Sequence, residues 1–215
     1  MEIESLNLPP QWSALFIFSS VLIYGLLHSL LASLRAKAIV RNLFGRIADR
    51  GYRLIFNLLA VITFLPILIF PTLLPDVYLY SIPYPWVVFT IIIQVLAILL
   101  LVVGLFQTGL WTFLGVRQLV YYPSDNHEEM VVGGLYQWVR HPLYMAGLIF
   151  IWFVPVMTLN VFALNVGLSV YLILGASIEE RKLVREFGQP YILYRSNTPK
   201  LFPMRIPRTN FKDRV

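Results

Sequence analysis

The sequence predicts an all-α, polytopic membrane protein with about five transmembrane helices. Of its 215 residues, 58% are hydrophobic and only 13% are charged, and the mean hydropathy is +0.72. Soluble domains carry about 25% charged residues. Several apolar stretches also approach or exceed the roughly 18 residues needed to cross a bilayer core of about 30 Å. A soluble fold could not bury this much apolar surface. No repeat or linker divides the chain, so we expect a single integral-membrane domain, 1–215.

Five apolar stretches are the expected spans, at 12–34, 54–74, 86–106, 143–157 and 161–178. The second span contains Pro66 and Pro71, which should bend it. The last two spans are separated only by residues 158–160, so they should form a tight helical hairpin. A further helix should follow from Glu179 and break near Gly188 before a second aromatic stretch, which gives a cytoplasmic cap helix. Its aromatic side chains should be buried, and its charged side chains should face water or lipid headgroups.

The placement of charge predicts the orientation. Of the 17 Lys and Arg residues, six lie between the first two spans, two lie between the third and fourth, and nine follow the fifth. The positive-inside rule therefore places the N-terminus outside and the C-terminus in the cytoplasm. The same charge predicts contact with anionic membrane lipid. The sequence has no nucleic-acid motif and gives no sign of an obligate protein partner.

The segment GGLYQWVRHPLY, at 133–144, is the sharpest local signal. Pro142 is favoured at the first position of a helix, so His141 should lie at the N-cap of the fourth span, beside Arg140. A helix N-terminus and a guanidinium together make an anion site at the membrane surface. Alternatively, Arg140 contacts lipid phosphate and His141 only caps the helix.

Two acidic residues, Glu179 and Glu180, and one histidine, His28, are further candidate site residues. Glu179 and Glu180 lie where the last span meets the cytoplasm. Acids at a membrane edge are costly unless they are solvated or paired. They should either pair with nearby Arg or Lys, Arg140 included, or join Arg140 in receiving a ligand that carries both signs of charge. His28, inside the first span, is either a site residue that faces the bundle interior or a structural histidine.

Several chemistries are unsupported by the sequence. No cysteine is present, which excludes disulfides and thiolate metal sites. The sequence has no dinucleotide-binding glycine motif, no P-loop and no zinc-protease motif, so we expect no metal, and helices must hold any cofactor.

The segments at 133–144 and at 179–203, EERKLVREFGQPYILYRSNTPKLFP, together resemble the paired signature of the isoprenylcysteine carboxyl methyltransferases and their prokaryotic relatives. Three other segments look closer to the methanethiol S-methyltransferases and the NnrU-type membrane proteins of that superfamily. These segments are HSLLAS at 28–33, FLGVRQL at 113–119 and FVPVMT at 153–158.

The resemblance implies that the segment 133–200 binds S-adenosylmethionine (SAM) and that the protein lies in a prokaryotic plasma membrane. Arg140 and the helix N-terminus at His141 would take the carboxylate of SAM, and Glu180 with Glu179 would take its cationic side. Arg140 and Glu180 are thus the expected catalytic residues. The adenosine would lie against Tyr136, Tyr144 and Tyr191. The methyl acceptor would enter from the lipid side, past His28, Gln118 and Trp138.

The expected function is SAM-dependent methylation of a small or lipophilic thiol such as methanethiol. Such a transfer is an in-line displacement at carbon, for which the protein must align the donor and the nucleophile and exclude water. Carboxyl methylation of an isoprenylcysteine-like acceptor is the second candidate. Two alternatives of other classes are an NADPH-dependent enzyme of the sterol-reductase type and a non-catalytic NnrU-like membrane protein.

Overall fold

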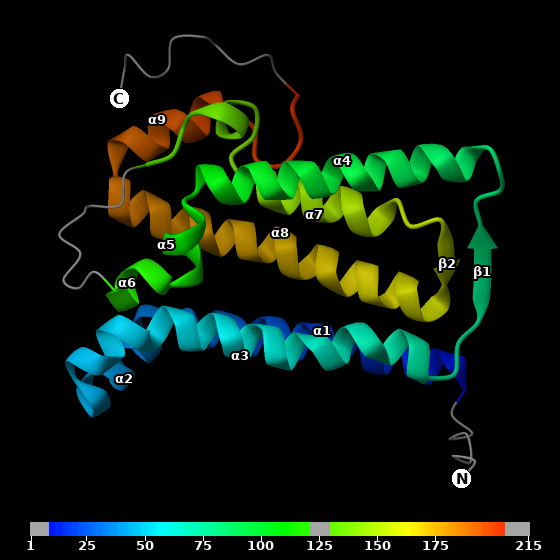
Figure 1. Cartoon of the computed structure of the whole chain (residues 1–215), viewed down its shortest axis with the longest axis horizontal. Helices are drawn as coiled ribbons and strands as arrows, with labels where there is room; N and C mark the ends of the chain where they lie inside the picture. Colours follow the sequence, from blue (N-terminus) through cyan, green and yellow to red (C-terminus); the bar gives the residue numbers. More distant parts are fainter. Residues whose placement is uncertain (1–8, 121–129, 205–215) are drawn as a thin grey trace.

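The structure is a computed structural model that describes residues 9–120 and 130–204. Long helices run side by side between two ends of a bundle (Figure 1). One end carries α2, α6 and α9, and the opposite end carries the two short strands (Figure 1). The elements in chain order are α1 (Pro10–Leu31), α2 (Leu34–Phe44), α3 (Arg46–Leu73), β1 (Tyr78–Ser81), α4 (Trp86–Gln107), α5 (Leu110–Leu114), α6 (Val116–Val120), η1 (Gly134–Gln137), α7 (Pro142–Trp152), β2 (Val156–Thr158), α8 (Leu159–Phe187) and α9 (Gln189–Asn197).

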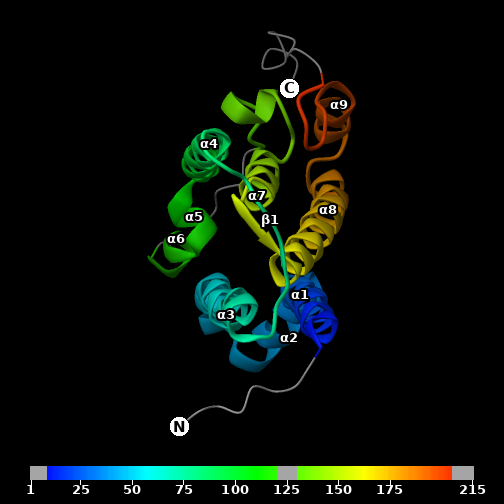
Figure 2. The ribbon, with the colours of Figure 1, turned by 90° about the vertical axis from the view of Figure 1, so that its right-hand side faces the viewer.

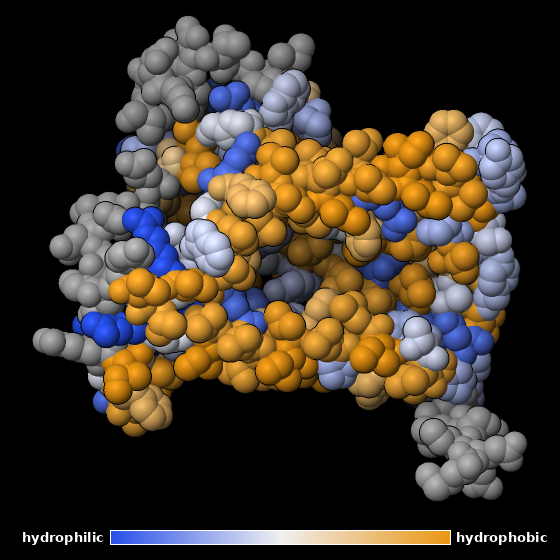
Figure 3. Space-filling view, in the orientation of Figure 1, coloured by the Kyte–Doolittle hydropathy of each residue, from blue (hydrophilic) through white to orange (hydrophobic). Residues whose placement is uncertain are grey.

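Within these described residues, four helices are long and apolar enough to cross a membrane, namely α1, α4, α8 and the part of α3 from Arg50 to Leu73. Their surfaces are rich in exposed apolar side chains, which give the broad hydrophobic band in Figure 3. A soluble protein would bury such side chains, whereas a bilayer solvates them. The predicted all-α polytopic membrane fold is confirmed.

The fourth expected span, 143–157, differs in form from the prediction. Its helix α7 has 11 residues, which span about 16 Å at 1.5 Å per residue and cannot cross about 30 Å of hydrocarbon. The helix ends at Trp152, shortly before Pro155, and Val156 and Met157 lie in strand β2 instead of in a helix. The chain completes this passage in extended form, because β2 pairs antiparallel with β1 at the far end of the bundle (Figure 1).

A buried asparagine fixes the start of α8 at that end. Asn160 is fully buried, and its backbone N–H donates to Oδ1 of Asp76 at 3.0 Å. Its side-chain Nδ2 donates to the carbonyls of Leu74 and Pro75 at 3.3 and 3.2 Å. The beginning of α8 is therefore tied to the connection between α3 and β1. Residues 153–158 join α7 to α8, so the connection is longer than the predicted tight turn at 158–160.

Close helix packing joins α8 to α1. The buried core combines Ile17 and Val21 of α1 with Leu164 and Leu168 of α8. A Cβ at Gly167 would lie only 3.0 Å from Cβ of Val21, so the two backbones approach closely at this glycine. Small residues commonly permit such close contact between membrane helices. The end view in Figure 2 shows α1 directly below α8, with α4 on the other side of α7.

We expect Gly167→Val to destabilise the protein by about 1–3 kcal/mol, because extra methyl groups would overpack the contact with Val21. The matched control is Gly175→Val on the same helix, since a Cβ at Gly175 meets nothing within 4 Å. Thermal unfolding in detergent measures both. Equal melting temperatures for the two variants would contradict the proposed close contact.

The cap helix α9 follows a sharp break at Gly188, whose φ of +61° favours glycine. The predicted break is thus confirmed. Tyr191 and Tyr194 of α9 are buried, at 2% and 3% exposure, as the aromatic pattern predicts. Beyond α9 the chain turns back over the start of α7, because the backbone N–H groups of Arg140 and His141 donate to the carbonyls of Pro199 and Lys200. This return segment, 198–200, fixes the end of the bundle where the predicted site residues meet.

Candidate functional site

A cavity of about 900 Å³ lies at the α9 end of the bundle. This volume falls within the range of small-molecule pockets. One side, which we call the motif wall, is formed by η1, α7, α8 and α9, and it includes six predicted site residues: Tyr136, Arg140, His141, Tyr144, Glu179 and Tyr191. The opposite side, the α3–α6 wall, carries the polar residues Arg53, Gln107, Thr112, Arg117 and Gln118.

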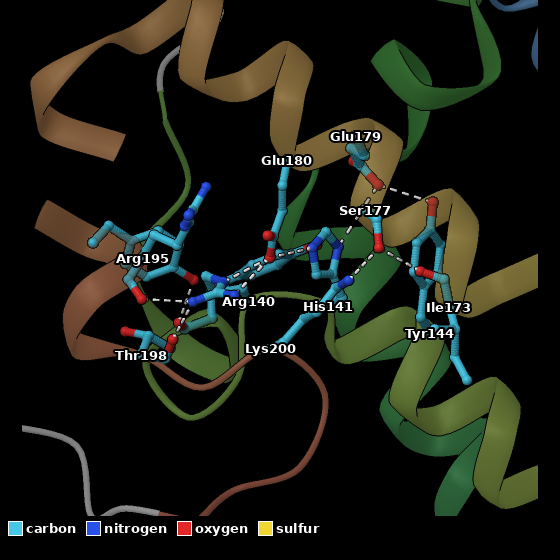
Figure 4. Close-up of polar contacts among 12 residues, drawn as sticks. Arg140, His141, Tyr144, Ile173, Ser177, Glu179, Glu180, Arg195, Thr198 and Lys200 are labelled. Carbon is cyan, nitrogen blue, oxygen red and sulfur yellow. Dashed lines mark hydrogen bonds and ion pairs between the residues drawn. The ribbon is translucent and has the colours of Figure 1, made fainter. Parts of the chain in front are cut away.

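Arg140 of the motif wall forms a buried ion pair with Glu180, which does not line the cavity (Figure 4). Nε and Nη2 of Arg140 lie 2.8 and 2.7 Å from Oε1 of Glu180, and the two side chains are only 10% and 11% exposed. Nη1 donates to the carbonyls of Arg195 and Thr198 at 2.6 and 2.7 Å. One guanidinium thus joins α8, α9 and the return segment, and most of its N–H donors are already used within the chain.

His141 lies at the N-cap of α7, with Pro142 at the first helical position, as predicted. Its Nε2 is 3.3 Å from Oε1 of Glu180, and its Nδ1 is 3.7 Å from Oε2 of Glu179. The imidazole stacks on the ring of Tyr144 with 5.3 Å between centroids. Burial lowers the pKa of His141, and this effect exceeds the opposing pull of the two carboxylates. The imidazole hydrogen-bonds to Glu180 through Nε2, whereas Oε2 of Glu179 lies beyond hydrogen-bond distance of Nδ1.

The adjacent acids Glu179 and Glu180 have different environments. The side chain of Glu179 is 47% exposed and lines the cavity, and its Oε2 accepts a hydrogen bond from the Tyr144 hydroxyl at 2.8 Å. Glu180 is 8% exposed and lies behind the wall against Arg140. Successive helical residues point about 100° apart, and here Glu179 lines the cavity whereas Glu180 does not. Of these two acids, Glu179 is the one available to a ligand.

Tyrosines supply the polar and aromatic surface of the motif wall. The hydroxyl of Tyr194 donates to the carbonyl of Tyr136 at 2.6 Å. The hydroxyl of Tyr191 is buried and has no hydrogen-bond partner within residues 9–120 and 130–204. Burial raises the pKa of Tyr136 and of Tyr191 to about 12, so both phenols stay protonated at neutral pH. A buried hydroxyl without a partner is costly and therefore indicates a ligand atom or a water at that position.

The three residues predicted to lie along the path of the methyl acceptor do not line one common cavity. Gln118 lines the cavity, where its Nε2 donates to the Thr112 carbonyl at 3.3 Å. Trp138 lies instead on a separate, apolar cavity of about 240 Å³. His28 lies outside the cavity lining, among the rings of Tyr24, Phe56 and Tyr171.

Sequence reasoning missed part of the cavity lining. Glu186 is exposed, as expected for a charged residue of this segment, but it also lines the cavity with Glu179, and their seven-residue spacing on one helix could have revealed this. Gln107 was also missed. Its Oε1 accepts a hydrogen bond from the backbone N–H of Leu135 at 3.0 Å, which holds η1 against α4. The segment YYPSDNH at 121–127, whose composition predicts turns, lies outside the described residues.

Comparison with known proteins identifies relatives of one kind. A protein of Crocosphaera subtropica (strain ATCC 51142 / BH68) is 27% identical over 193 residues, which are 84% of this chain and 71% of that protein. A protein of Pseudomonas deceptionensis is 38% identical over 69 residues, 32% of this chain and 26% of that protein. One from Mycobacterium tuberculosis is 33% identical over 69 residues, 32% of this chain and 28% of that protein. All three are named methanethiol S-methyltransferase. The chain is a homologue of these methanethiol S-methyltransferases.

The predicted likeness to methanethiol S-methyltransferases is thus confirmed. The matches to the Pseudomonas and Mycobacterium enzymes cover only about a quarter of the relatives' own length. No protein-family model matches the chain, so membership of the wider isoprenylcysteine carboxyl methyltransferase superfamily stays a prediction. No solved structure matches it either.

Proposed function

We propose that this chain is an integral-membrane, SAM-dependent methyltransferase that methylates a small thiol such as methanethiol. The observation that carries the proposal is the cavity between the motif wall and the α3–α6 wall, in which a carboxylate and an unpartnered phenol are presented to a ligand. The homology to methanethiol S-methyltransferases supports the same activity.

The polar groups of the cavity fit SAM, which carries a sulfonium, an ammonium, a carboxylate and an adenosine. Glu179 offers a negative charge to the cationic groups. The Tyr191 hydroxyl and Oε1 of Gln118 are buried atoms without partners among the described residues, and they can bond to polar atoms of the cofactor. Tyr136 and Tyr144 offer ring surface to the adenosine.

Bound SAM would supply an electrophilic methyl group, which moves to the thiol sulfur as the sulfonium C–S bond breaks, while the thiol proton goes to water. The protein acts chiefly by alignment and by exclusion of water. Glu179 would bind and orient the cation. Arg140 and Glu180 serve as positioning residues in this proposal, because their contacts hold α8, α9 and the return segment together.

The acceptor would reach the cavity from the lipid side. Figure 3 shows a hollow in the apolar face between α3 and α4. We place the α9 end on the cytoplasmic side with the N-terminus outside, because the basic residues of α2, Arg53, Arg117 and Arg140 all belong to that end. The basic residues at 205–214 lie outside the described part of the chain.

Incubation of the purified, detergent-solubilised protein with SAM and methanethiol tests the proposal. We expect dimethyl sulfide in the headspace by gas chromatography and an equal amount of S-adenosylhomocysteine (SAH) by liquid chromatography. A parallel reaction with a farnesylated cysteine tests the carboxyl-methylation alternative. If the protein binds SAH and gives product only from the farnesylated cysteine, the methyl acceptor is an isoprenylcysteine-like carboxylate instead of a small thiol. If folded protein binds no SAH, the methyltransferase proposal is wrong, and binding of NADPH would then support a reductase.

A further inference from the structure

We propose that Arg117, assisted by Arg53 and Gln118, recognises the amino-acid end of the cofactor, with the carboxylate on Arg117 and the ammonium on Oε1 of Gln118. This inference rests on the proposed function and deepens it. It assigns the carboxylate to the α3–α6 wall, whereas the sequence motif assigned it to Arg140 on the motif wall.

The polar groups of Arg140 are already engaged within the protein. Its guanidinium contacts Glu180 and the carbonyls of Arg195 and Thr198, and a planar guanidinium has five N–H donors in all. The charge of Arg140 is also neutralised by Glu180 at 2.7 Å. A ligand carboxylate at Arg140 would have to compete with a buried carboxylate that is already in place.

Arg117 lines the same cavity, and its charge is available to a ligand. Within residues 9–120 and 130–204, the Arg117 side chain has no hydrogen bond or ion pair. Arg53 lines the cavity as well but has a further interaction of its own, so we take Arg117 as the principal residue. Two guanidinium groups on one wall make that part of the cavity attractive to an anion.

The fold holds Arg117 and Arg53 close together. A Cβ at Gly115, between α5 and α6, would lie 2.6 Å from the backbone N of Leu54 and 2.9 Å from the backbone C of Arg53. The short helices therefore pack directly on α3 at Arg53. One turn further along α3, Nδ2 of Asn57 donates to the carbonyl of Phe113 at 2.9 Å. These contacts fix α6, and with it Arg117, beside Arg53 at the cavity.

Unpartnered polar atoms of two cavity residues also indicate a ligand. Oε1 of Gln118 is buried and has no hydrogen-bond partner among the described residues, although its Nε2 is fixed by the Thr112 carbonyl. Across the cavity, the Tyr191 side chain is 2% exposed and its hydroxyl lacks a partner too. An α-amino acid presents an acceptor carboxylate and a donor ammonium on one carbon. Arg117 offers only donors and Oε1 of Gln118 is an acceptor, so these consecutive residues complement both groups.

The test compares two ligands by isothermal titration of the full-length protein in detergent. One is SAH, and the other is decarboxylated SAH, which lacks only the carboxylate. We expect Arg117→Gln to weaken SAH binding about 10- to 100-fold, the effect of losing a charge-assisted hydrogen bond. Binding of decarboxylated SAH should stay unchanged. Arg117→Lys keeps the charge but loses the planar fork, so it should give an intermediate loss for SAH alone.

The matched control is Lys37→Gln, which removes one positive charge from α2 at the same end of the bundle but outside the cavity lining. It should bind both ligands as the wild type does. Melting temperatures show that each variant is folded. If wild type binds SAH and Arg117→Gln either weakens both ligands equally or weakens neither, the inference is wrong and the proposed function stands. If wild type binds no SAH, both the inference and the proposed function are wrong. If it then binds NADPH and Arg117→Gln abolishes that binding, the anion bound at Arg117 is a phosphate.

Discussion

Replacement of Arg140 by alanine should abolish measurable SAH binding and destabilise the protein by about 3–5 kcal/mol. The substitution leaves Glu180, which is 8% exposed, as a buried carboxylate without its guanidinium partner. Breaking a buried ion pair by removing one partner costs about this much, because the remaining charge is uncompensated. It also frees the carbonyls of Arg195 and Thr198, so the return segment loses its link to α8. Tyr191 and Tyr194 on α9 should then shift away from the cavity.

Thermal unfolding and titration with SAH measure the two effects. Arg195→Ala is the matched control, because Arg195 contacts Arg140 through its backbone carbonyl, which alanine retains. This variant should melt and bind nearly as wild type does. Arg140→Lys should fall between the two, since lysine keeps the charge but cannot reach Glu180 and two carbonyls with one planar fork. A stable Arg140→Ala protein with normal SAH affinity would show that the ion pair does not organise the site.

The sequence predicts the motif wall well because its signals are local. Pro142 at the first turn of α7 places His141 at the N-cap, and Gly188 breaks the chain before α9. Both follow from the backbone preferences of single residues. The spacing of the two motifs predicts that Arg140 and the adjacent acids meet. It does not predict which acid faces the cavity, because that depends on the rotation of α8 about its axis, which packing against α1 sets.

The features that the sequence did not predict depend on contacts between distant segments. Strand β2 ends the fourth expected span because residues 75 to 80 positions earlier pair with it, and no local pattern near Pro155 reveals that partner. Arg53 and Arg117 line one cavity because Gly115 lets the α5–α6 turn approach α3. His28 looks like a site residue in the sequence because a polar ring in a span is rare. In the structure its neighbours are the rings of Tyr24, Phe56 and Tyr171.

Glu179→Gln and Glu180→Gln should separate ligand binding from support of the fold. The two variants remove the same charge from neighbouring positions of α8, so each is the matched control for the other. Glu180→Gln removes the partner of Arg140 and should destabilise the protein by about 3–5 kcal/mol. Glu179→Gln should leave the melting temperature nearly unchanged, because Glu179 is 47% exposed and glutamine can still accept a hydrogen bond from Tyr144.

The ligand preference of Glu179→Gln carries the stronger test. SAM and SAH differ by a methyl group and by the positive charge on sulfur, and a carboxylate near that sulfur favours SAM. We expect Glu179→Gln to reduce the ratio of SAM to SAH affinity by about 10- to 100-fold, as the loss of an interaction between a charge and its counter-charge would. Titration with each ligand measures this ratio. Glu180→Gln should weaken both ligands alike, because a displaced α9 affects the adenosine end that they share. If the two variants changed this ratio equally, Glu179 and Glu180 would have the same effect on the cationic sulfur. The positioning role of Glu180 would then be wrong.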